Sequence, residues 1–125
     1  MGLVLLDSSV LIALLNPKDL HHEEALNSNS ALKQFMISSI SITELMPRAI
    51  RDGISDSIWR ALLGITRKVV DVDLEVARAA ATLRAHKGMK TPDAIISATA
   101  ALHGAELWTF DAQLAKATPG ALLLS

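Results

Sequence analysis

Short apolar runs alternate with longer amphipathic stretches along the whole chain. Runs of this length, apolar at nearly every position, are typical of strands buried on both faces of a parallel sheet. We therefore predict five strands, over residues 3–6, 35–38, 69–72, 107–110 and 121–124.

The stretches between these runs have helical periodicity and helix-terminating residues. They predict helices over residues 10–15, 21–34, 41–52, 57–68, 74–86, 92–103 and 112–116. Ser8 or Ser9 can cap the first of them, and Thr91 the one that opens with Pro92. Pro47 is expected near the first turn of its helix, where a missing N–H is tolerated. Strands that alternate with helices predict an α/β fold, with helices on both faces of a mainly parallel sheet.

Composition narrows the class of protein. The 125 residues fit one domain, half of them are apolar and few are aromatic, so the core must be aliphatic. So large an apolar share also suggests that a partner covers some apolar surface. The absence of cysteine excludes disulfides and thiolate metal sites and favours a reducing, cytoplasmic setting. No run is long enough to span a membrane, and neither a secretory signal nor a myristoylation signal is expected at the start.

Charge is unevenly distributed, although the net charge is only −1. Between residues 48 and 90 nine basic side chains face five acidic ones, a local excess of four. These bases either lie on ordinary solvated helix faces or form a basic margin for a phosphate backbone. The pattern alone leaves both readings open.

Four acidic residues stand where an apolar run meets the start of a helix: Asp7, Glu44, Asp93 and Asp111. Each has a structural explanation of its own. Asp7 and Asp111 can cap helices, and Ser41-x-x-Glu44 has the form of a capping box. Asp93 lies in the first turn of its helix, where the helix dipole favours an anion.

As a set, the acids point to a cation. Active sites of open parallel sheets lie outside the carboxyl ends of the strands, where Asp7 and Asp111 fall directly and Glu44 follows. The pattern does not place Asp93, because its helix is preceded by another helix. Two carboxylates about 4 Å apart repel by roughly 4 kcal/mol at an effective dielectric near 20, against a net stability of about 5–15 kcal/mol. If the acids converge, Mg²⁺ or Mn²⁺ is the expected occupant.

Histidine-based metal sites are less well supported. The run His21-His22-Glu23-Glu24 contains four possible ligands, but adjacent helical histidines point about 100° apart and no HExxH spacing is present. We interpret it as a solvated helix start.

The ordered acidic motifs resemble those of PIN-domain ribonucleases. Asp7-Ser8-Ser9-Val10-Leu11-Ile12 is similar to their opening strand, turn and helix, and Thr43-Glu44-Leu45 to their second acidic position. Thr91-Pro92-Asp93-Ala94-Ile95-Ile96 is similar to the third, and Thr109-Phe110-Asp111 to the fourth. The resemblance spans nearly the whole chain, and its length fits VapC toxins of type II toxin–antitoxin pairs. One departure is Phe110, where the family often carries a basic residue.

The resemblance implies a single PIN domain over residues 1–125, with a three-layer α/β/α architecture. It implies Mg²⁺- or Mn²⁺-dependent endonucleolytic cleavage of RNA, with Asp7, Glu44, Asp93 and Asp111 as catalytic residues. Asp7 and Asp93 would bind the metal directly, Glu44 and Asp111 directly or through water, and Thr109 would support them from behind. A homodimer and a VapB-type antitoxin that covers the acidic groove are implied as partners.

Two other classes of protein remain as alternatives. A phosphatase of the haloacid dehalogenase type also begins with a strand and an aspartate, but it needs a second aspartate where this chain has Ser9, and a receiver-type Mg²⁺ switch lacks its paired acid here. A catalytically idle PIN-like module that only binds a partner would retain the fold without the activity.

Overall fold

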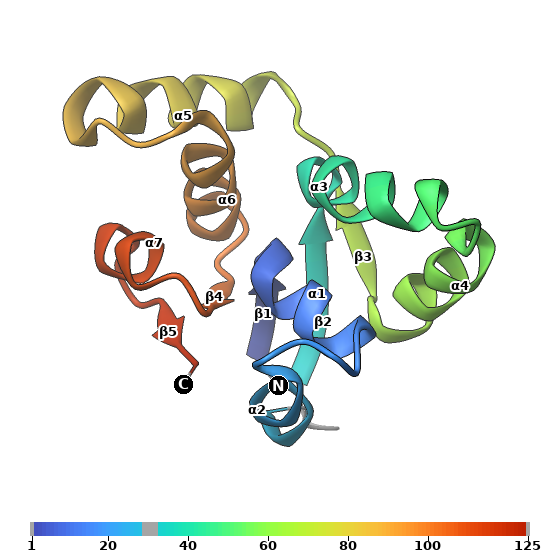
Figure 1. Cartoon of the computed structure of the whole chain (residues 1–125). Coiled ribbons are helices and arrows are strands. Elements are labelled where there is room, and N and C mark those ends of the chain that lie inside the picture. Colours follow the sequence, from blue (N-terminus) through green and yellow to red (C-terminus); the bar gives the residue numbers. More distant parts are fainter. Residues whose placement is uncertain (1, 29–32, 125) are drawn as a thin grey trace.

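Five parallel strands form the central sheet of the computed structural model, which describes residues 2–28 and 33–124 (Figure 1). Their order is β3-β2-β1-β4-β5, and every neighbouring pair is parallel. The strands are β1 (Gly2–Leu6), β2 (Lys33–Ser38), β3 (Lys68–Val70), β4 (Glu106–Thr109) and β5 (Leu122–Leu123). All five predicted strands are therefore confirmed, with bounds shifted by at most two residues.

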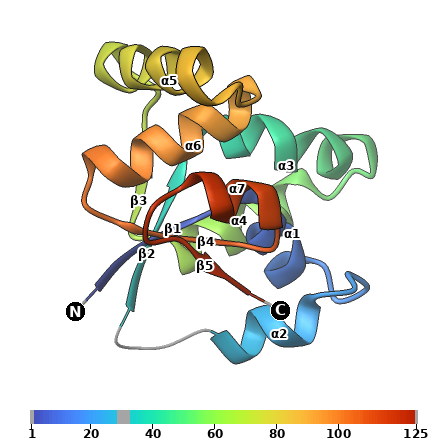
Figure 2. The ribbon, with the colours of Figure 1, turned by 90° about the vertical axis from the view of Figure 1, so that its left-hand side faces the viewer.

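Helices cover both faces of this sheet (Figures 1 and 2). They are α1 (Ser8–Leu15), α2 (His22–Ser28), α3 (Ser39–Arg51), α4 (Ser55–Ile65), α5 (Leu74–Lys87), α6 (Thr91–Leu102) and α7 (Ala112–Ala117). Buried side chains of α1, α3 and α4 share one hydrophobic cluster with the sheet, whereas those of α6 and α7 share another. Helix α5 packs on α6 in a third cluster. The expected three-layer α/β/α architecture is confirmed.

The strands alternate their side chains between the two clusters. Val4 and Leu6 enter the cluster under α1, whereas Leu5 between them enters the cluster under α6. Successive strand residues point to opposite faces, so a strand covered on both sides is apolar at every position. Burial on both faces of the sheet therefore explains why residues 3–6 are all apolar.

The start of α3 differs from the prediction. Helix α3 begins at Ser39, because the Ser38 side chain accepts a hydrogen bond from the Ile40 N–H and caps it. A capping box between Ser41 and Glu44 is thus wrong, and Pro47 lies inside the helix instead of in its first turn. Neighbouring serines can each cap, so pattern alone chose the wrong one.

Other boundaries moved for related reasons. Thr91 is the first residue of α6 and not its cap, and the N-cap Lys90 makes no side-chain capping bond. Asp7, not Ser8 or Ser9, caps α1. The helix predicted over residues 21–34 corresponds to α2 up to Ser28, residues 29–32 lie outside the described residues, and residues 33–34 belong to β2 instead.

The strand order creates a natural site at the centre of the sheet. The chain passes from β1 to β2 on one side, and β4 lies on the other side of β1. Ligands of open parallel sheets bind at such a reversal, outside the carboxyl ends of the strands. Asp7 follows β1 directly, and Asp111 comes two residues after β4.

Among residues 2–28 and 33–124, no helix has both the length and the apolar character that crossing a membrane requires.

Candidate active site

Asp7 is the most firmly held acid of the site. Its side chain is 7% exposed, and its Oδ1 accepts a hydrogen bond of 2.8 Å from the Ser8 N–H as the cap of α1. Its Oδ2 accepts two hydroxyl hydrogen bonds, from Ser9 Oγ and from Thr109 Oγ1, each of 2.8 Å. The backbone N–H of Asp7 also donates to the Trp108 carbonyl at 3.1 Å. Groups from β4 and from the start of α1 therefore hold Asp7 in place.

Thr109 connects the acids that follow β1 and β4. Its buried hydroxyl donates to Asp7 Oδ2 and accepts a hydrogen bond of 2.9 Å from the Asp111 N–H. Asp111 caps α7, because its Oδ1 accepts from the Gln113 and Leu114 N–H groups at 2.9 and 3.3 Å. The capping roles expected for Asp7 and Asp111 are thus present, and one hydroxyl links the two residues.

Glu44 and Asp93 reach the site from two other helices. Glu44 lies on α3, which starts at the carboxyl end of β2, and Asp93 lies in the first turn of α6. Ile96 and Ala100 of α6 pack into the cluster under the sheet, which anchors this helix against β1 and β4. Tertiary packing thus places Asp93, which the alternation of strands and helices could not.

Electrostatic coupling shows that all four acids share one region. Burial raises the pKa of Glu44, and the charges of Asp7 and Asp93 raise it further, while a hydrogen bond with the Ser8 side chain lowers it. Burial also raises the pKa of Asp93, followed by the charges of Asp111 and Asp7, with Lys90 acting in the opposite direction. Like charges that are close together disfavour ionisation. The acids therefore repel one another when they are ionised.

The donor set fits a hard cation. In the described part of the chain, no three histidine or acidic side chains stand close enough together to form a ready metal cluster. Mg²⁺ does not need one, because it keeps several waters and often takes only one or two carboxylates. Among the described residues, the buried Ser41 hydroxyl, three residues before Glu44 on α3, has no hydrogen-bond partner. Carboxylates whose charges oppose one another are groups that a cation would stabilise.

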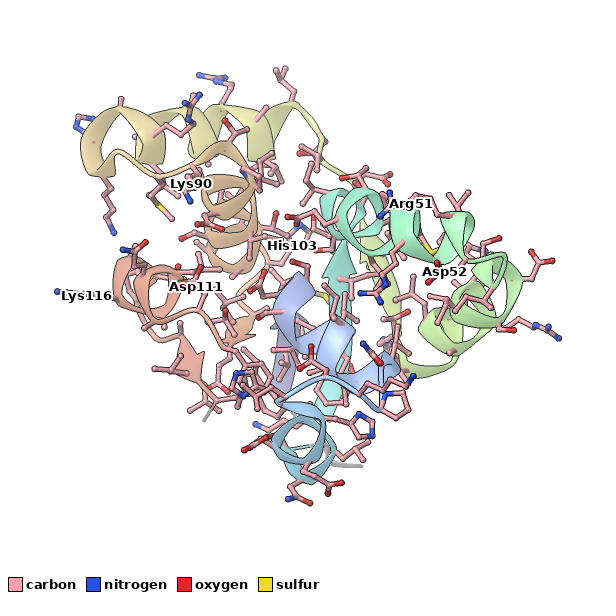
Figure 3. All side chains as sticks on the ribbon, in the orientation of Figure 1. Arg51, Asp52, Lys90, His103, Asp111 and Lys116 are labelled. Carbon is pink, nitrogen blue, oxygen red and sulfur yellow. The ribbon has the colours of Figure 1, made fainter. Side chains whose placement is uncertain are left out.

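The basic residues of segment 48–90 do not form one strip. All nine are exposed, and they are spread over α3, α4, β3, α5 and the loops that join them. Figure 3 shows Lys90 and Asp111 on the same side of the molecule, across α1 from Arg51 and Asp52. The charge of Lys90 lowers the pKa of Asp93, so this base lies close enough to influence the acids.

An aromatic contact beside the acids was not expected from the sequence. The ring of His21, in the loop between α1 and α2, stacks on Phe110 with centroids 4.3 Å apart and an interplanar angle of 14°. His22 Nδ1 lies 2.6 Å from the Ala13 carbonyl oxygen. The run does start a helix, α2, as predicted, but its two histidine rings are engaged and partly buried instead of fully solvated. A contact across about 90 residues leaves no periodic signal in the sequence.

A largely apolar groove of about 520 Å³ begins at Glu44. It runs between the end of α1, α3 and α4. Its lining residues are Ile12, Leu15, Asn16, Pro17, Lys18, Glu44, Leu45, Arg48, Ala49, Asp52, Ile54 and Ile58. Near its rim Arg48 Nε lies 3.6 Å from Asp52 Oδ2, an exposed pair of little energetic value.

Comparison with known proteins gives one family. The sequence matches the PIN domain family over residues 4–118. A toxin–antitoxin complex from Klebsiella pneumoniae is 29% identical and has a TM-score of 0.79, with 95% of each chain covered. DNA-bound VapBC from Salmonella typhimurium is 26% identical over 98% of this chain and 97% of that chain, with a TM-score of 0.71. FitAcB from Neisseria gonorrhoeae shares the fold, at 21% identity, 96% coverage of each chain and a TM-score of 0.79. No match was found among curated protein sequences.

Proposed function

Because the chain belongs to the PIN domain family and has the fold of VapC-type PIN domains, we propose that it is a metal-dependent endoribonuclease and the toxin of a type II toxin–antitoxin pair. The single observation that carries the proposal is the hydrogen-bonded link from Asp7 through the Thr109 hydroxyl to Asp111, at the carboxyl ends of β1 and β4. Glu44 and Asp93 are close enough for the charge of Asp7 to raise the pKa of each. Carboxylates gathered in this way are costly unless a cation offsets their charge.

We assign the four acids different roles. Asp7 and Asp93 bind Mg²⁺ or Mn²⁺ directly, and Glu44 completes the site or orients a water. Asp111 acts directly or through water. Thr109 holds Asp7 in place, since its hydroxyl donates to Asp7 Oδ2. Groups behind a ligand commonly set its orientation and basicity in this way.

The chemistry would be hydrolysis of a phosphodiester. A bound divalent ion polarises the phosphate and lowers the pKa of the attacking water. The chain's own part is to hold the Asp7 carboxylate in place through its three side-chain hydrogen bonds, one of them from the fully buried Thr109 hydroxyl. Glu44 is exposed at the mouth of the site, where it is available to accept a proton from water.

An antitoxin is the proposed protein partner. The similar Klebsiella protein was solved as a toxin–antitoxin complex, and the groove next to Glu44 offers a place for such a partner. Its apolar wall would receive aliphatic side chains of a peptide segment, and a basic residue at the end of that segment would face the acids. Occupation of the groove would thereby block access to the site.

A homodimer is proposed as well. Leu74 at the start of α5 is 75% exposed, and it lines a shallow surface pocket together with Leu102 of α6. Exposed leucines that are adjacent favour a protein contact over solvent. Light scattering of the purified chain would test this: a mass that doubles to the dimer value is expected, and Leu74→Asp would lower it to the monomer value. A strictly monomeric wild type would exclude the dimer.

The direct test of the proposed function is cleavage of structured RNAs by the purified protein with Mg²⁺, with Mn²⁺ or with EDTA. Cleavage is expected with either metal and none with EDTA. Mg²⁺ or Mn²⁺ should also raise the melting temperature, because an ion at 100 times its Kd adds about 2.7 kcal/mol to the free energy of unfolding. A protein that binds the metal but cleaves no RNA would favour the alternative of an idle, partner-binding module. Cleavage that persists in EDTA would exclude the metal mechanism.

A further inference from the structure

Phe110, whose ring stacks on that of His21, is linked to the acids through its backbone. Phe110 stands between Thr109 and Asp111, and its backbone N–H donates to Ser9 Oγ at 3.2 Å. The same Ser9 hydroxyl donates to Asp7 Oδ2 at 2.8 Å. One hydroxyl therefore separates the backbone of Phe110 from the central carboxylate.

This pair differs from the aromatic pair in the core. The chain contains only two Phe and two Trp residues. Phe35 and Trp108 meet edge to face at 5.5 Å and 67°, and both are buried. His21 and Phe110 are instead nearly parallel, and both are partly exposed. Phe110 also packs against the hydrophobic cluster under α1, but the stack remains partly open to solvent and is not a fully buried core contact.

Hydrogen bonds hold the segment that carries His21, and Phe110 contacts one face of its ring. The backbone N–H of His21 donates to Asp19 Oδ1 at 2.9 Å, and the neighbouring His22 ring lies against the Ala13 carbonyl. A ring held in this way loses little further freedom when a ligand stacks on it. The pair is thus a preorganised flat surface.

RNA binding at this site needs an attraction that does not depend on charge. The acids repel phosphate groups, the net charge is −1, and the exposed bases are spread over several elements. Aromatic side chains supply such an attraction, because nucleobases of single-stranded RNA stack on Phe and His rings.

We propose that the His21–Phe110 pair is a stacking platform for one nucleobase of single-stranded RNA, next to the phosphodiester held at the acids. The proposal rests on the proposed ribonuclease function and adds a residue pair that positions its substrate. It assigns a role to Phe110 at the position where the sequence departs from its family.

The test is equilibrium binding of short single-stranded RNAs in EDTA, where no cleavage occurs. The RNAs form a series in which one nucleotide at a time lacks its base. The wild type should lose about 5- to 150-fold in affinity when the base at one particular position is missing. Phe110→Leu, which keeps apolar volume but loses the flat ring, should bind the intact RNA more weakly by a similar factor and be insensitive to the missing base.

Three further variants sharpen the result. Phe110→Trp should retain the dependence on the base, and His21→Ala should weaken it. Trp59→Leu removes an aromatic residue of α4 that is 39% exposed and should change nothing. Phe110→Trp and the wild-type series keep the test decisive if Phe110→Leu fails to fold.

The platform is overturned if the wild type shows no loss at any position, if it binds none of the RNAs, or if Phe110→Leu matches the wild type. Cleavage with Mg²⁺ separates this failure from failure of the proposed function. A wild type that cleaves RNA but shows no dependence on a single base would remain a ribonuclease without a platform. A contact that serves only a protein partner would give the same indifference to missing bases.

Discussion

Asp7 and Asp111 are held by backbone N–H groups and hydroxyls, whereas Glu44 and Asp93 stand on α3 and α6 with raised pKa values. We call the first two the fixed pair and the other two the repelled pair. The fixed pair is stable without a metal, because helix caps and Thr109 already satisfy it. The repelled pair is destabilising when ionised, so its charge is where a cation has most to offset. The fixed pair therefore sets the position of the site, and the repelled pair supplies the negative charge that a metal would neutralise.

The largest effect is expected at the fixed pair. Asp7→Asn keeps the size of the side chain but removes its charge and one of its two acceptor oxygens. Changes behind a metal ligand cost about 10–100-fold, so loss of a ligand charge should reduce single-turnover RNA cleavage by more than about 100-fold. A rate within tenfold of the wild type would mean that Asp7 is only a helix cap.

The next effect is expected at Thr109. Thr109→Val removes the hydroxyl that links Asp7 and Asp111, and calorimetric titration should show Mn²⁺ affinity reduced about 10–100-fold. Thr99→Val is the matched control, because it removes an equally buried hydroxyl that donates to the Ile95 carbonyl within α6. If both variants bind Mn²⁺ alike, the hydroxyl between the acids has a structural role alone.

A smaller effect of opposite sign is expected at the repelled pair. Asp93→Asn should raise the melting temperature in EDTA, by roughly 4 °C for each kcal/mol of repulsion relieved in a chain of this size. Glu75→Gln is the control, since Glu75 also lies in the first turn of a helix, and its loss should cost about 0.3–1 kcal/mol. If Asp93→Asn melts earlier, as Glu75→Gln should, attraction to the helix dipole outweighs repulsion between the acids.

The finest test is the pH dependence of this stabilisation. Folding raises the pKa of Asp93 above 3.8 and that of Glu44 above 4.5. A carboxyl whose pKa is raised on folding stabilises the fold fully below its unfolded pKa and loses that contribution as pH rises through its folded pKa. The stability gained by Asp93→Asn in EDTA should therefore be small near pH 4 and grow at higher pH. Urea unfolding at stepped pH measures it, and a gain that is constant over this range would contradict mutual repulsion.

Much of the fold could be predicted because burial on both faces leaves a plain signal. A strand covered on two sides must be apolar throughout, as in residues 3–6, and the helix starts of Asp7 and Asp111 follow from capping chemistry. Choices between neighbouring residues of equal chemistry could not be made in this way. Ser38 caps α3, although Ser41 has the same hydroxyl.

The four acids of the candidate site were named from the sequence, whereas their contacts in space were not. Asp93 entered the set through its resemblance to a family motif, since no strand precedes its helix. The link through Thr109 was expected only as an implication of that resemblance, and the stack of His21 on Phe110 was missed altogether. Each of these depends on segments that are remote in the sequence.

By itself, the sequence determined the α/β class and the parallel strands, because these depend on local burial and local backbone chemistry. The tertiary structure alone decided that the acids repel one another, that Asp7 and Asp111 share one hydroxyl, and that His21 reaches Phe110. The physical reason is that charge repulsion and ring stacking depend on distance in space. Only the packing of α3, α6 and the loop after α1 against the sheet sets those distances.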